Sequence, residues 1–330
     1  MTAVPISVFG AGSYGTALAI QLARNGHPVR LWGRDTAALA PLRTERVNSR
    51  YLPECPFPDR LQVCPELAEA AATERWLLAV PSHALAGMLA LLQPLWRPGV
   101  EILCAAKGFA PDSALMPHEL VAEHLPEAPF VAISGPTFAR EVGRGMPSAL
   151  TVASTDAALA HAVAEQLHGT AMRTYTSEDV IGVAVGGGVK NVIAIAVGAA
   201  DGLGLGANTR ALLITRGLSE MMRLSEALGG HRETLMGLAG MGDLVLTCTD
   251  DQSRNRRFGK AVGQGGDLAQ AEKAIGQVVE GVRNAVEVHT LAERHGVDMP
   301  LASEVYRVLH EGSPVREAFW RLVSRPLRSE

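Results

Sequence analysis

The sequence lacks paired cysteines, a metal-binding motif and an excess of positive charge. Its four cysteines, Cys55, Cys64, Cys104 and Cys248, form no C-x-x-C pair and have no regular spacing. We therefore expect reduced packing residues in a cytoplasmic protein. The ten histidines show no H-E-x-x-H or comparable signature, so we expect no metal site. With 30 Lys and Arg against 34 Asp and Glu, the net charge is -4. This argues against nucleic acid as a partner, because counterion release needs a basic surface.

The sequence also lacks an apolar run long enough to span a bilayer. The longest candidate lies near Val192 and is interrupted by Lys190 and Asn191, so we expect no membrane span. A strand pattern begins at Ile6, which leaves no room for a signal peptide. No internal repeat or low-complexity segment is present. The remaining composition, 47% hydrophobic and 19% charged over 330 residues, is typical of a globular protein with two domains.

The first half opens with a strand, a glycine-rich turn, a helix and a second strand. The β-rich run 6–9 leads directly into Gly10, Gly12 and Gly15 of a G-x-G-x-x-G pattern, and the second strand pattern ends at Trp32. In this context Gly10 permits the tight turn, Gly12 lets the backbone approach a pyrophosphate, and Gly15 lets the helix pack on the strand. Free N–H groups at the helix start bind the phosphates. This order predicts a dinucleotide-binding domain, with a glycine turn that binds no nucleotide as the alternative.

The residues after the second strand bear on the choice of cofactor. An acidic residue there binds the ribose 2′-hydroxyl of NAD, whereas an arginine accommodates the 2′-phosphate of NADP. The order Gly33-Arg34-Asp35 offers both. Because Arg34 comes first, we expect NADP(H) to be favoured, while Asp35 leaves NAD(H) open. The alternative for Arg34 is a solvated surface cation.

Compact β runs then recur, and each ends in a loop with polar or glycine residues. The runs 76–80, 100–106 and 130–133 lead into Pro81-Ser82-His83, Lys107-Gly108-Phe109 and Ser134-Gly135-Pro136-Thr137. In doubly wound sheets, ligands bind beyond the carboxyl ends of the strands, so these loops are expected to meet at the nicotinamide half of the cofactor. Lys107 is a candidate anion contact, with an ordinary surface lysine as the alternative.

The other segments complete the predicted architecture. Residues 36–74 predict a helix, a proline-rich loop, a short strand near 61–64 and an alanine-rich helix, and 149–153 and 172–175 predict closing strands. After residue 178, helical patterns dominate. We therefore predict an α/β protein with an N-terminal Rossmann-type doubly wound sheet over 1–178 and an all-helical C-terminal domain over 179–330.

The segment 177–201 predicts a long helix at the joint between the two halves. Ser177 is the expected helix start, and acidic residues follow it in the first turn. Lys190 is the one cation in this apolar stretch. Three glycines at 186–188 cost helix stability, roughly 1 kcal/mol each relative to alanine, and indicate that something approaches the bare backbone. The alternative is a glycine-faced packing seam with a snorkelling lysine.

Two polar clusters follow in the helical half. Asp243 stands directly after Gly240-Met241-Gly242, where its carboxylate can face a cavity; a helix N-cap is the alternative. The segment 251–259 holds three arginines together with Ser253 and Asn255. Planar guanidinium groups beside short polar donors suit a phosphate. In a net acidic protein this favours a small phosphorylated ligand, with a solvated charge run as the alternative.

A desolvated lysine is a usable general acid. Hydride delivery to a carbonyl carbon leaves charge on the oxygen, which needs a proton or a cation nearby. We expect burial to lower the pKa of Lys190 toward working pH, Asp243 to hold and orient its amine, and Lys107 to add a second positive group. Lys190, Asp243 and Lys107 are therefore the predicted catalytic residues.

Five motifs occur in order over essentially the whole chain: Gly10-Ala-Gly-Ser-Tyr-Gly15, Ser134-Gly-Pro-Thr-Phe-Ala139, Gly187-Gly-Val-Lys-Asn-Val-Ile-Ala194, Gly240-Met-Gly-Asp-Leu-Val-Leu-Thr-Cys-Thr249 and Gln252-Ser-Arg-Asn-Arg-Arg-Phe-Gly259. Together they resemble the bacterial NAD(P)-dependent glycerol-3-phosphate dehydrogenase family. The resemblance implies reversible reduction of dihydroxyacetone phosphate to sn-glycerol 3-phosphate, which supplies the backbone of phospholipids. It also implies that Lys190 is the proton donor and acceptor.

The resemblance implies ligand contacts residue by residue. The expected substrate contacts are Lys107, Gly135, Thr137, Lys190, Asp243, Ser253, Arg254 and Asn255. The expected cofactor contacts, besides Gly10, Gly12 and Gly15, are Ser13, Tyr14, Arg34, Lys107, Ala139, Arg254, Val278 and Glu280. The sequence leaves a homodimer open.

Two rival functions are left open. A dehydrogenase of the β-hydroxyacid type, such as 6-phosphogluconate dehydrogenase, also sets a lysine on a glycine-flanked helix and fits the Ser253-Arg254-Asn255 cluster equally well. A nucleotide sensor that binds NADPH without chemistry explains the glycine turn but gives Lys190 and Asp243 no joint purpose.

Overall fold

The computed structural model describes residues 3–326, and the chain divides into two compact units. Unit 1 comprises residues 1–110 and 115–184, and unit 2 comprises 111–114 and 185–330. The division falls within helix α8 (Val180–Gly202), whereas the sequence predicts a boundary after residue 178. That predicted boundary stays a prediction.

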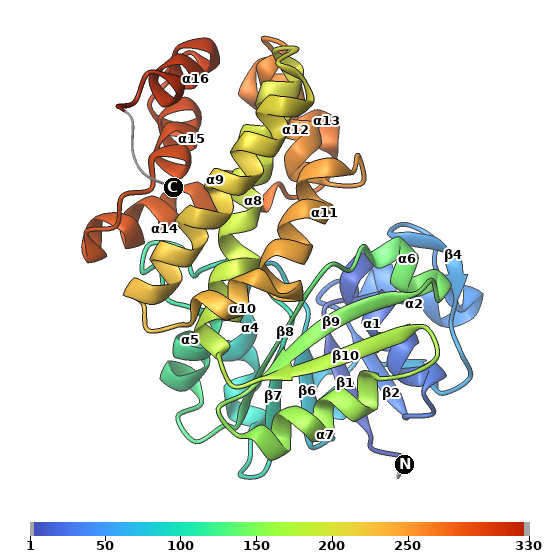
Figure 1. The fold of residues 1–330 in the computed structure, drawn as a ribbon. Helices are drawn as coiled ribbons and strands as arrows, with labels where there is room; N and C mark the ends of the chain where they lie inside the picture. The colour runs from blue at the N-terminus through green and yellow to red at the C-terminus, as the bar shows by residue number, and fades with distance from the viewer. Residues whose placement is uncertain (1–2, 327–330) are drawn as a thin grey trace. The chain divides into compact units, whose positions relative to one another are not determined.

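Unit 1 is built on an eight-stranded sheet of order β10-β9-β8-β7-β6-β1-β2-β5 (Figure 1). Its strands are β1 (Ile6–Phe9), β2 (Val29–Trp32), β5 (Leu61–Val63), β6 (Arg75–Leu78), β7 (Glu101–Cys104), β8 (Phe130–Ser134), β9 (Ser148–Ala153) and β10 (Met172–Ser177). All neighbours pair in parallel except β8 and β9, which are antiparallel. The strand order reverses between β1 and β6, which is the switch point where such sheets bind ligands. The predicted Rossmann-type doubly wound sheet is confirmed.

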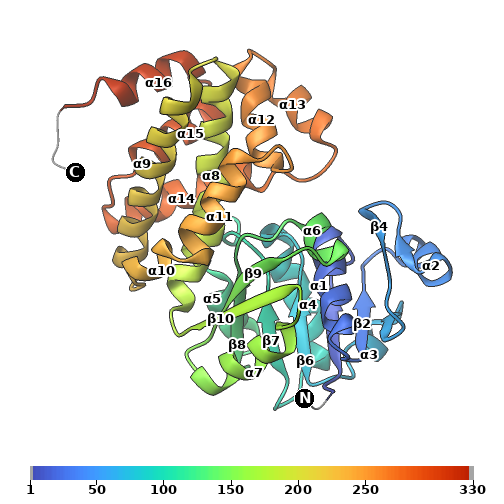
Figure 2. The same ribbon diagram turned by 45° about the vertical axis from the view of Figure 1, so that its right-hand side comes forward.

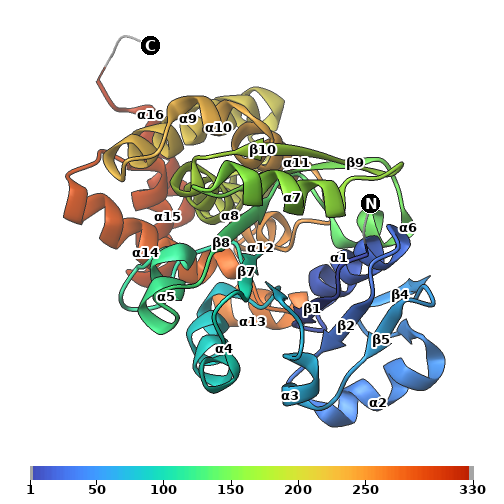
Figure 3. The ribbon, with the colours of Figure 1, turned by 90° about the horizontal axis from the view of Figure 1, so that it is seen from below.

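Helices cover both faces of this sheet, so central strands such as β1 are buried on both sides. Successive residues of β1 point to opposite faces: Val8 belongs to a core shared with α1 (Ser13–Arg24) and α7 (Ala157–Leu167). Phe9 belongs to the other core, which includes α4 (Leu85–Leu92) and α5 (Pro117–His124). Figure 3 shows the two helical layers on either side of the strands. All four residues of β1 are therefore buried, and the glycine-rich turn follows directly after Phe9.

The segment predicted as a proline-rich loop contains a short antiparallel hairpin, so that part of the prediction is wrong. Strand β3 (Val47–Asn48) pairs with β4 (Leu52–Pro56) after helix α2 (Thr36–Glu45). Prolines are compatible with it because a two-stranded ribbon consists only of edge strands. The hairpin packs on α6 (Ala139–Arg144). A Cβ at Gly143 of that helix would lie 2.7 Å from Cys55 Sγ, so side chains of β4 pack directly against the backbone of α6.

From α8 onward the structure is helical throughout the described residues, as predicted. The helices of unit 2 after α8 are α9 (Gly206–Ala227), α10 (Arg232–Met236), a π-helical turn η3 (Leu238–Gly242), α11 (Asp243–Thr249), α12 (Arg254–Gly263), α13 (Leu268–Ile275), α14 (Glu280–His295), α15 (Pro300–His310) and α16 (Val315–Val323).

Helix α8 begins later than predicted. Ser177 is the last residue of β10, so its assignment as the helix start is wrong. The side chain of Asp179 accepts a hydrogen bond from Gly182 N at 2.7 Å and caps the helix instead. By length and composition α8 could cross a membrane, but 89% of its most apolar window is buried within the structure. Such burial is the pattern of a core helix.

Helices α8 and α12 meet backbone to backbone along a glycine seam (Figure 2). A Cβ added at Gly198, Gly202, Gly259 or Gly263 would lie 2.1 to 2.3 Å from a carbonyl oxygen of the facing helix. Only glycine fits at these four positions. The separation of the two helices is therefore set by main-chain contact.

Candidate functional site

The glycine-rich turn of unit 1 uses its three glycines in two ways. Gly10 has a φ of +121°, and a Cβ there would lie 2.5 Å from Ala79 O; a Cβ at Gly15 would lie 2.0 Å from Gly10 O. These two glycines are required by packing. A Cβ at Gly12 would meet no protein atom within 4 Å. Packing does not require glycine there, so the bare backbone at the start of α1 fits the approach of a dinucleotide pyrophosphate.

Four of the predicted contact residues in unit 1 form one cluster beside this turn. Lys107 Nζ donates to Gly135 O at 2.9 Å and lies 5.3 Å from the ring centroid of Tyr14. Tyr14 Oη and Thr137 Oγ1 are 2.8 Å apart, and Thr137 Oγ1 donates to Gly135 O at 3.2 Å. The loops after β7 and β8 are thus joined to the first turn of α1. Lys107 is half-buried and held by these partners, so it is not an ordinary surface lysine.

Gly135 makes this cluster possible through its backbone. Its φ is +146°, and a Cβ would lie 2.8 Å from Leu150 Cα, so no other residue fits between β8 and β9. Ala139, another predicted cofactor contact, is the first residue of α6.

Arg34 and Asp35 follow β2 and are both exposed. Asp35 Oδ1 accepts a hydrogen bond from Ala38 N at 3.1 Å and caps α2. The carboxylate that would bind a ribose hydroxyl is therefore engaged by the protein. Arg34 lies before the cap, as the first charged side chain after the strand.

Lys190 is buried in unit 2 and paired with a carboxylate. It is 6% exposed and Asp243 is 1% exposed. Lys190 Nζ donates to Asp243 Oδ1 at 2.5 Å and to Thr247 Oγ1 at 3.0 Å, and the Thr247 hydroxyl donates to Asp243 O at 2.6 Å. The interpretation of Lys190 as a snorkelling side chain is wrong. The interpretation of Asp243 as an N-cap is also wrong, because Gly242 occupies that position.

A close helix approach brings these three side chains together. A Cβ at Gly186 would lie 2.4 Å from Ala239 O in the π-helical turn η3, so at this glycine the approaching group is the protein's own backbone. Lys190 follows Gly186 by one turn of α8, and Asp243 begins α11 directly after η3. Thr247, four residues later, lies on the same face of α11 as Asp243. Single π turns of this kind recur at functional sites.

The surroundings of Lys190 act on its charge in opposite directions. Burial disfavours the ammonium form, whereas the Asp243 carboxylate and the Thr247 hydroxyl favour it. Removing one partner of such a buried pair typically costs about 3–5 kcal/mol of stability. Burial also raises the pKa of the neighbouring Cys248 thiol, so this thiol stays protonated and is not a nucleophile.

The predicted phosphate cluster lies at the start of α12. Ser253 Oγ accepts from Arg256 N at 3.2 Å and caps the helix. Asn255 Nδ2 donates to Asn191 Oδ1 at 2.8 Å, which links this turn to the residue beside Lys190. Arg254 Nη1 donates to Gln277 Oε1 at 3.1 Å. Val278 is exposed, and Glu280 begins α14, the helix that follows Gln277.

The three arginines of this segment have different surroundings. Arg256 is 6% exposed and forms ion pairs with Asp201, at 2.7 Å, and with Asp251. It therefore stabilises unit 2 internally, and the alternative of a solvated charge run is wrong for this residue. Arg257 is exposed and Arg254 is half-buried, so Arg254 is the arginine placed beside Ser253 and Asn255 with some exposure.

Two family models match the chain over both halves. The model described as the NAD-dependent glycerol-3-phosphate dehydrogenase N-terminus matches residues 5–160, and the one described as the C-terminus matches 179–320. The chain belongs to the NAD-dependent glycerol-3-phosphate dehydrogenase family. The glycerol-3-phosphate dehydrogenases are NAD(P)-dependent oxidoreductases, so the predicted family and enzyme class are confirmed.

Two bacterial relatives and one solved structure of a glycerol-3-phosphate dehydrogenase match over nearly their whole length. The chain is 52% identical to glycerol-3-phosphate dehydrogenase [NAD(P)+] of Halorhodospira halophila over 98% of both chains. It is 53% identical to the protein of that name from Thioalkalivibrio sulfidiphilus over 100% of both. The crystal structure of the Coxiella burnetii enzyme superposes with a TM-score of 0.95 at 46% identity, covering 98% of this chain and 99% of that one. D-mandelate dehydrogenase, at 13% identity and a TM-score of 0.64, shares the fold alone.

Thr247 is the residue of the buried cluster that sequence reasoning misses. Leu244-Val245-Leu246 is too short to indicate a strand, and the helix α11 is not predicted there. With the segment assigned to a helix, Thr247 falls one turn from Asp243 on the same face. That i, i+4 spacing is the signal that could have found it.

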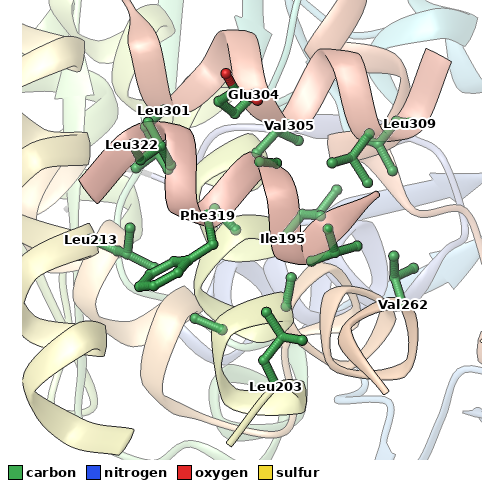
Figure 4. A pocket seen from close by; sticks show the side chains of 16 residues that line it. Ile195, Leu203, Leu213, Val262, Leu301, Glu304, Val305, Leu309, Phe319 and Leu322 are labelled. Carbon is green, nitrogen blue, oxygen red and sulfur yellow. The ribbon is translucent and has the colours of Figure 1, made fainter. Parts of the chain in front are cut away.

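An apolar cavity within unit 2 differs from these polar clusters. It has a volume of about 50 Å³ and is lined by α8, α9, α12, α15 and α16. Figure 4 shows Leu213 and Phe319 reaching toward one another within it. The one charged lining side chain, Glu304, is paired with Arg307 and Arg321.

Within residues 3–326, no group of three or more His, Cys, Asp and Glu side chains is placed to hold a metal ion.

Proposed function

We propose that this chain catalyses the reversible NAD(P)-dependent reduction of dihydroxyacetone phosphate to sn-glycerol 3-phosphate, with Lys190 as the general acid and base. The observation that carries the proposal is the buried Lys190–Asp243 pair, 2.5 Å apart, in a chain of the glycerol-3-phosphate dehydrogenase family. A buried lysine fixed by a carboxylate is a positioned proton donor.

Unit 1 supplies the residues that hold the cofactor. Gly10, Gly12 and Gly15 form the turn, and Ser13 and Tyr14 begin the helix whose N-terminus favours the pyrophosphate charge. When bound, the nicotinamide transfers a hydride to or from the carbon that bears the reacting oxygen. Lys107, held by Gly135 O, keeps a positive group at the strand ends of this unit, where it can bind an anionic ligand.

Unit 2 supplies the proton and the phosphate contacts. In the direction of reduction, Lys190 gives a proton to the substrate oxygen, and in oxidation it takes that proton back. Asp243 holds the amine by charge, and Thr247 Oγ1 accepts a hydrogen bond from it. These two partners set the orientation of the amine. Ser253, Arg254 and Asn255 are proposed to bind the substrate phosphate.

We propose that NADP(H) is favoured over NAD(H), both of which the names of the relatives allow. Arg34 supports this preference because a guanidinium pairs with the 2′-phosphate. The engagement of Asp35 by Ala38 N, at 3.1 Å, supports it further, because a capping carboxylate is less available to a ribose hydroxyl.

An absorbance assay tests the reaction directly. The purified protein should oxidise NADPH, and NADH more slowly at equal concentration, when dihydroxyacetone phosphate is added. NADP reduction with 6-phosphogluconate should be absent. Tight NADPH binding without turnover of dihydroxyacetone phosphate would overturn the proposal in favour of a nucleotide sensor.

The product suggests the physiological setting. We propose that the protein works in the cytoplasm and supplies sn-glycerol 3-phosphate for phospholipid synthesis. Its four cysteines are free and buried, which suits a reducing compartment. Size-exclusion chromatography with light scattering decides between the monomer and the homodimer that the sequence leaves open.

A further inference from the structure

The β3–β4 hairpin carries a buried amide next to the glycine-rich turn of unit 1. Asn48, at the end of β3, is 1% exposed. Its Nδ2 donates to Ala11 O at 3.0 Å and to Thr16 Oγ1 at 2.8 Å. Its Oδ1 accepts from Tyr51 N at 3.2 Å. The side-chain N–H groups of Asn48 thus bond to the glycine-rich turn and to the first turn of α1. Its side-chain oxygen forms a hydrogen bond within the hairpin.

The bond to Ala11 O acts on the peptide group that enters α1. The carbonyl of Ala11 and the N–H of Gly12 belong to the same planar peptide, and in a trans peptide they point in opposite directions. Holding the carbonyl toward Asn48 therefore aims the Gly12 N–H away from the hairpin. Gly12 is the N-cap of α1, and N–H groups at this position bind phosphate.

The hairpin itself is fixed to the rest of unit 1, so Asn48 has a firm base. Arg46, directly before β3, donates through Nη2 to Pro58 O at 2.7 Å and to Leu61 O at 3.2 Å. Leu52 and Cys55 of β4 pack against the backbone of Gly143. The same hairpin thus supports the glycine-rich turn and α6, the helix that begins at Ala139.

We propose that Asn48 is a positioning residue for the cofactor: its amide locks the Ala11–Gly12 peptide in the orientation that binds the pyrophosphate. The inference rests on the proposed function only in assuming that NAD(P)H binds at this turn. Because Asn48 is 1% exposed, the proposal gives it no direct contact with the cofactor. It acts through the main chain, which is why no motif in the sequence points to it.

The test compares Asn48→Asp with Asn25→Asp. The first substitution keeps an acceptor for Tyr51 N but turns a carboxylate oxygen toward Ala11 O. Asn25 provides a matched control at the other end of α1, because its Nδ2 donates to Gln166 O at 2.7 Å and to His168 O at 2.9 Å. Each variant loses two amide hydrogen bonds at one end of the same helix, and only Asn48→Asp affects the turn.

The readouts are the Kd for NADPH by fluorescence titration, the melting temperature, and the split between KM and kcat. For Asn48→Asp we expect the Kd and KM for NADPH to rise about tenfold, corresponding to one lost net hydrogen bond and the added repulsion. We expect kcat and the KM for dihydroxyacetone phosphate to stay within about twofold. Asn25→Asp should lower the melting temperature but leave the Kd for NADPH unchanged.

Equal NADPH affinity in the two variants would overturn the proposal and leave Asn48 a purely structural residue. If Asn48→Asp does not fold, Asn48→Ser, which removes the amide without adding a charge, is measured in the same way with a severalfold rise expected. Because Kd is measured without turnover, the inference is separable from the proposed function. A wild-type protein that binds NADPH but does not reduce dihydroxyacetone phosphate refutes the latter alone.

Discussion

The two units bring their candidate functional residues together by different means. In unit 1 the turn comes from six consecutive residues, 10–15, and the groups that we propose to bind the pyrophosphate are its main-chain N–H groups. In unit 2 the central contact joins Lys190 and Asp243, which are 53 residues apart in the chain. The glycine-rich turn is determined by neighbouring residues in the sequence. The Lys190–Asp243 pair forms only when α8 and α11 pack together. A site that binds an anion through main-chain N–H groups tolerates substitution of its side chains. A site that transfers a proton through a side chain does not.

The largest expected effect comes from removing the amine of Lys190 in unit 2. We expect Lys190→Ala to lower kcat by about 10²–10⁴-fold, the usual contribution of general acid catalysis, with an unchanged Kd for NADPH. Because the substitution leaves Asp243 buried without its partner, stability falls as well. The double variant Lys190→Ala/Asp243→Asn should recover much of that stability without recovering turnover. Lys273→Ala, on the exposed face of α13, is the control. Near-normal turnover of purified Lys190→Ala refutes the assignment.

Unit 2 also contains buried carboxyl groups outside the candidate site, and these make its stability depend on pH. Glu220 is 1% exposed and accepts from Leu301 N and Ala302 N at 2.7 and 3.0 Å. Burial raises its pKa from 4.5 to about 7. The folded state therefore holds this proton more tightly than the unfolded state does. The resulting stability is complete below pH 4.5 and is lost as the pH rises through 7.

Urea unfolding at pH 5 and pH 8 measures this contribution. Between these two pH values we expect the wild-type free energy of unfolding to fall by about 2–3 kcal/mol more than that of Glu220→Gln. The glutamine cannot ionise, so the variant has lost this part of the pH dependence. Identical pH dependence in both proteins would show that Glu220 keeps its ordinary pKa.

Substitutions in the predicted phosphate cluster test whether unit 2 also binds the substrate. Arg254→Ala should raise the KM for dihydroxyacetone phosphate about tenfold, because a charge-assisted hydrogen bond contributes roughly 1.5–3 kcal/mol. Arg257→Ala, on the same helix but exposed, should change it little. Steady-state kinetics with both ligands varied separate the effects. A change in the cofactor constant alone contradicts the assignment of Arg254 to the substrate phosphate.

The smallest expected effect falls on unit 1, at the choice between cofactors. Arg34→Ala should reduce the preference for NADPH over NADH severalfold, with little change in the KM for NADH, because an exposed ion pair contributes about 1 kcal/mol or less. Arg43→Ala, on the exposed surface of α2, is the matched control. An unaltered ratio of the two specificity constants would exclude Arg34 from recognition of the 2′-phosphate.

The parts that could be predicted from the sequence are those set by local pattern. Apolar strands such as 6–9 and 29–32, the Gly10–Gly15 turn and the long helix around Lys190 all carry their signal within a few residues. The approach of the Gly186 backbone to η3 could not be predicted, because it depends on which carbonyl the packed helix faces. The same holds for the hydrogen bonds of Asn48, which lies in a proline-containing segment whose hairpin has only a weak sequence signal.

The backbone-to-backbone contact of α8 with α12 has a consequence for the size of the proposed substrate. Lys190 lies on α8, and the Ser253–Asn255 turn starts α12. The four glycines of the seam place no side chain between the two backbones that could be shortened or lengthened. The spacing between Lys190, the proposed proton donor, and the Ser253–Asn255 turn, which is proposed to bind the phosphate, is therefore set by main-chain contact of the two helices. If the proposed substrate spans these two groups, we expect that substitutions at the four glycines cannot adapt the spacing to a longer or shorter phosphorylated alcohol. Such a change in spacing would require one of the two helices, α8 or α12, to shift along the other.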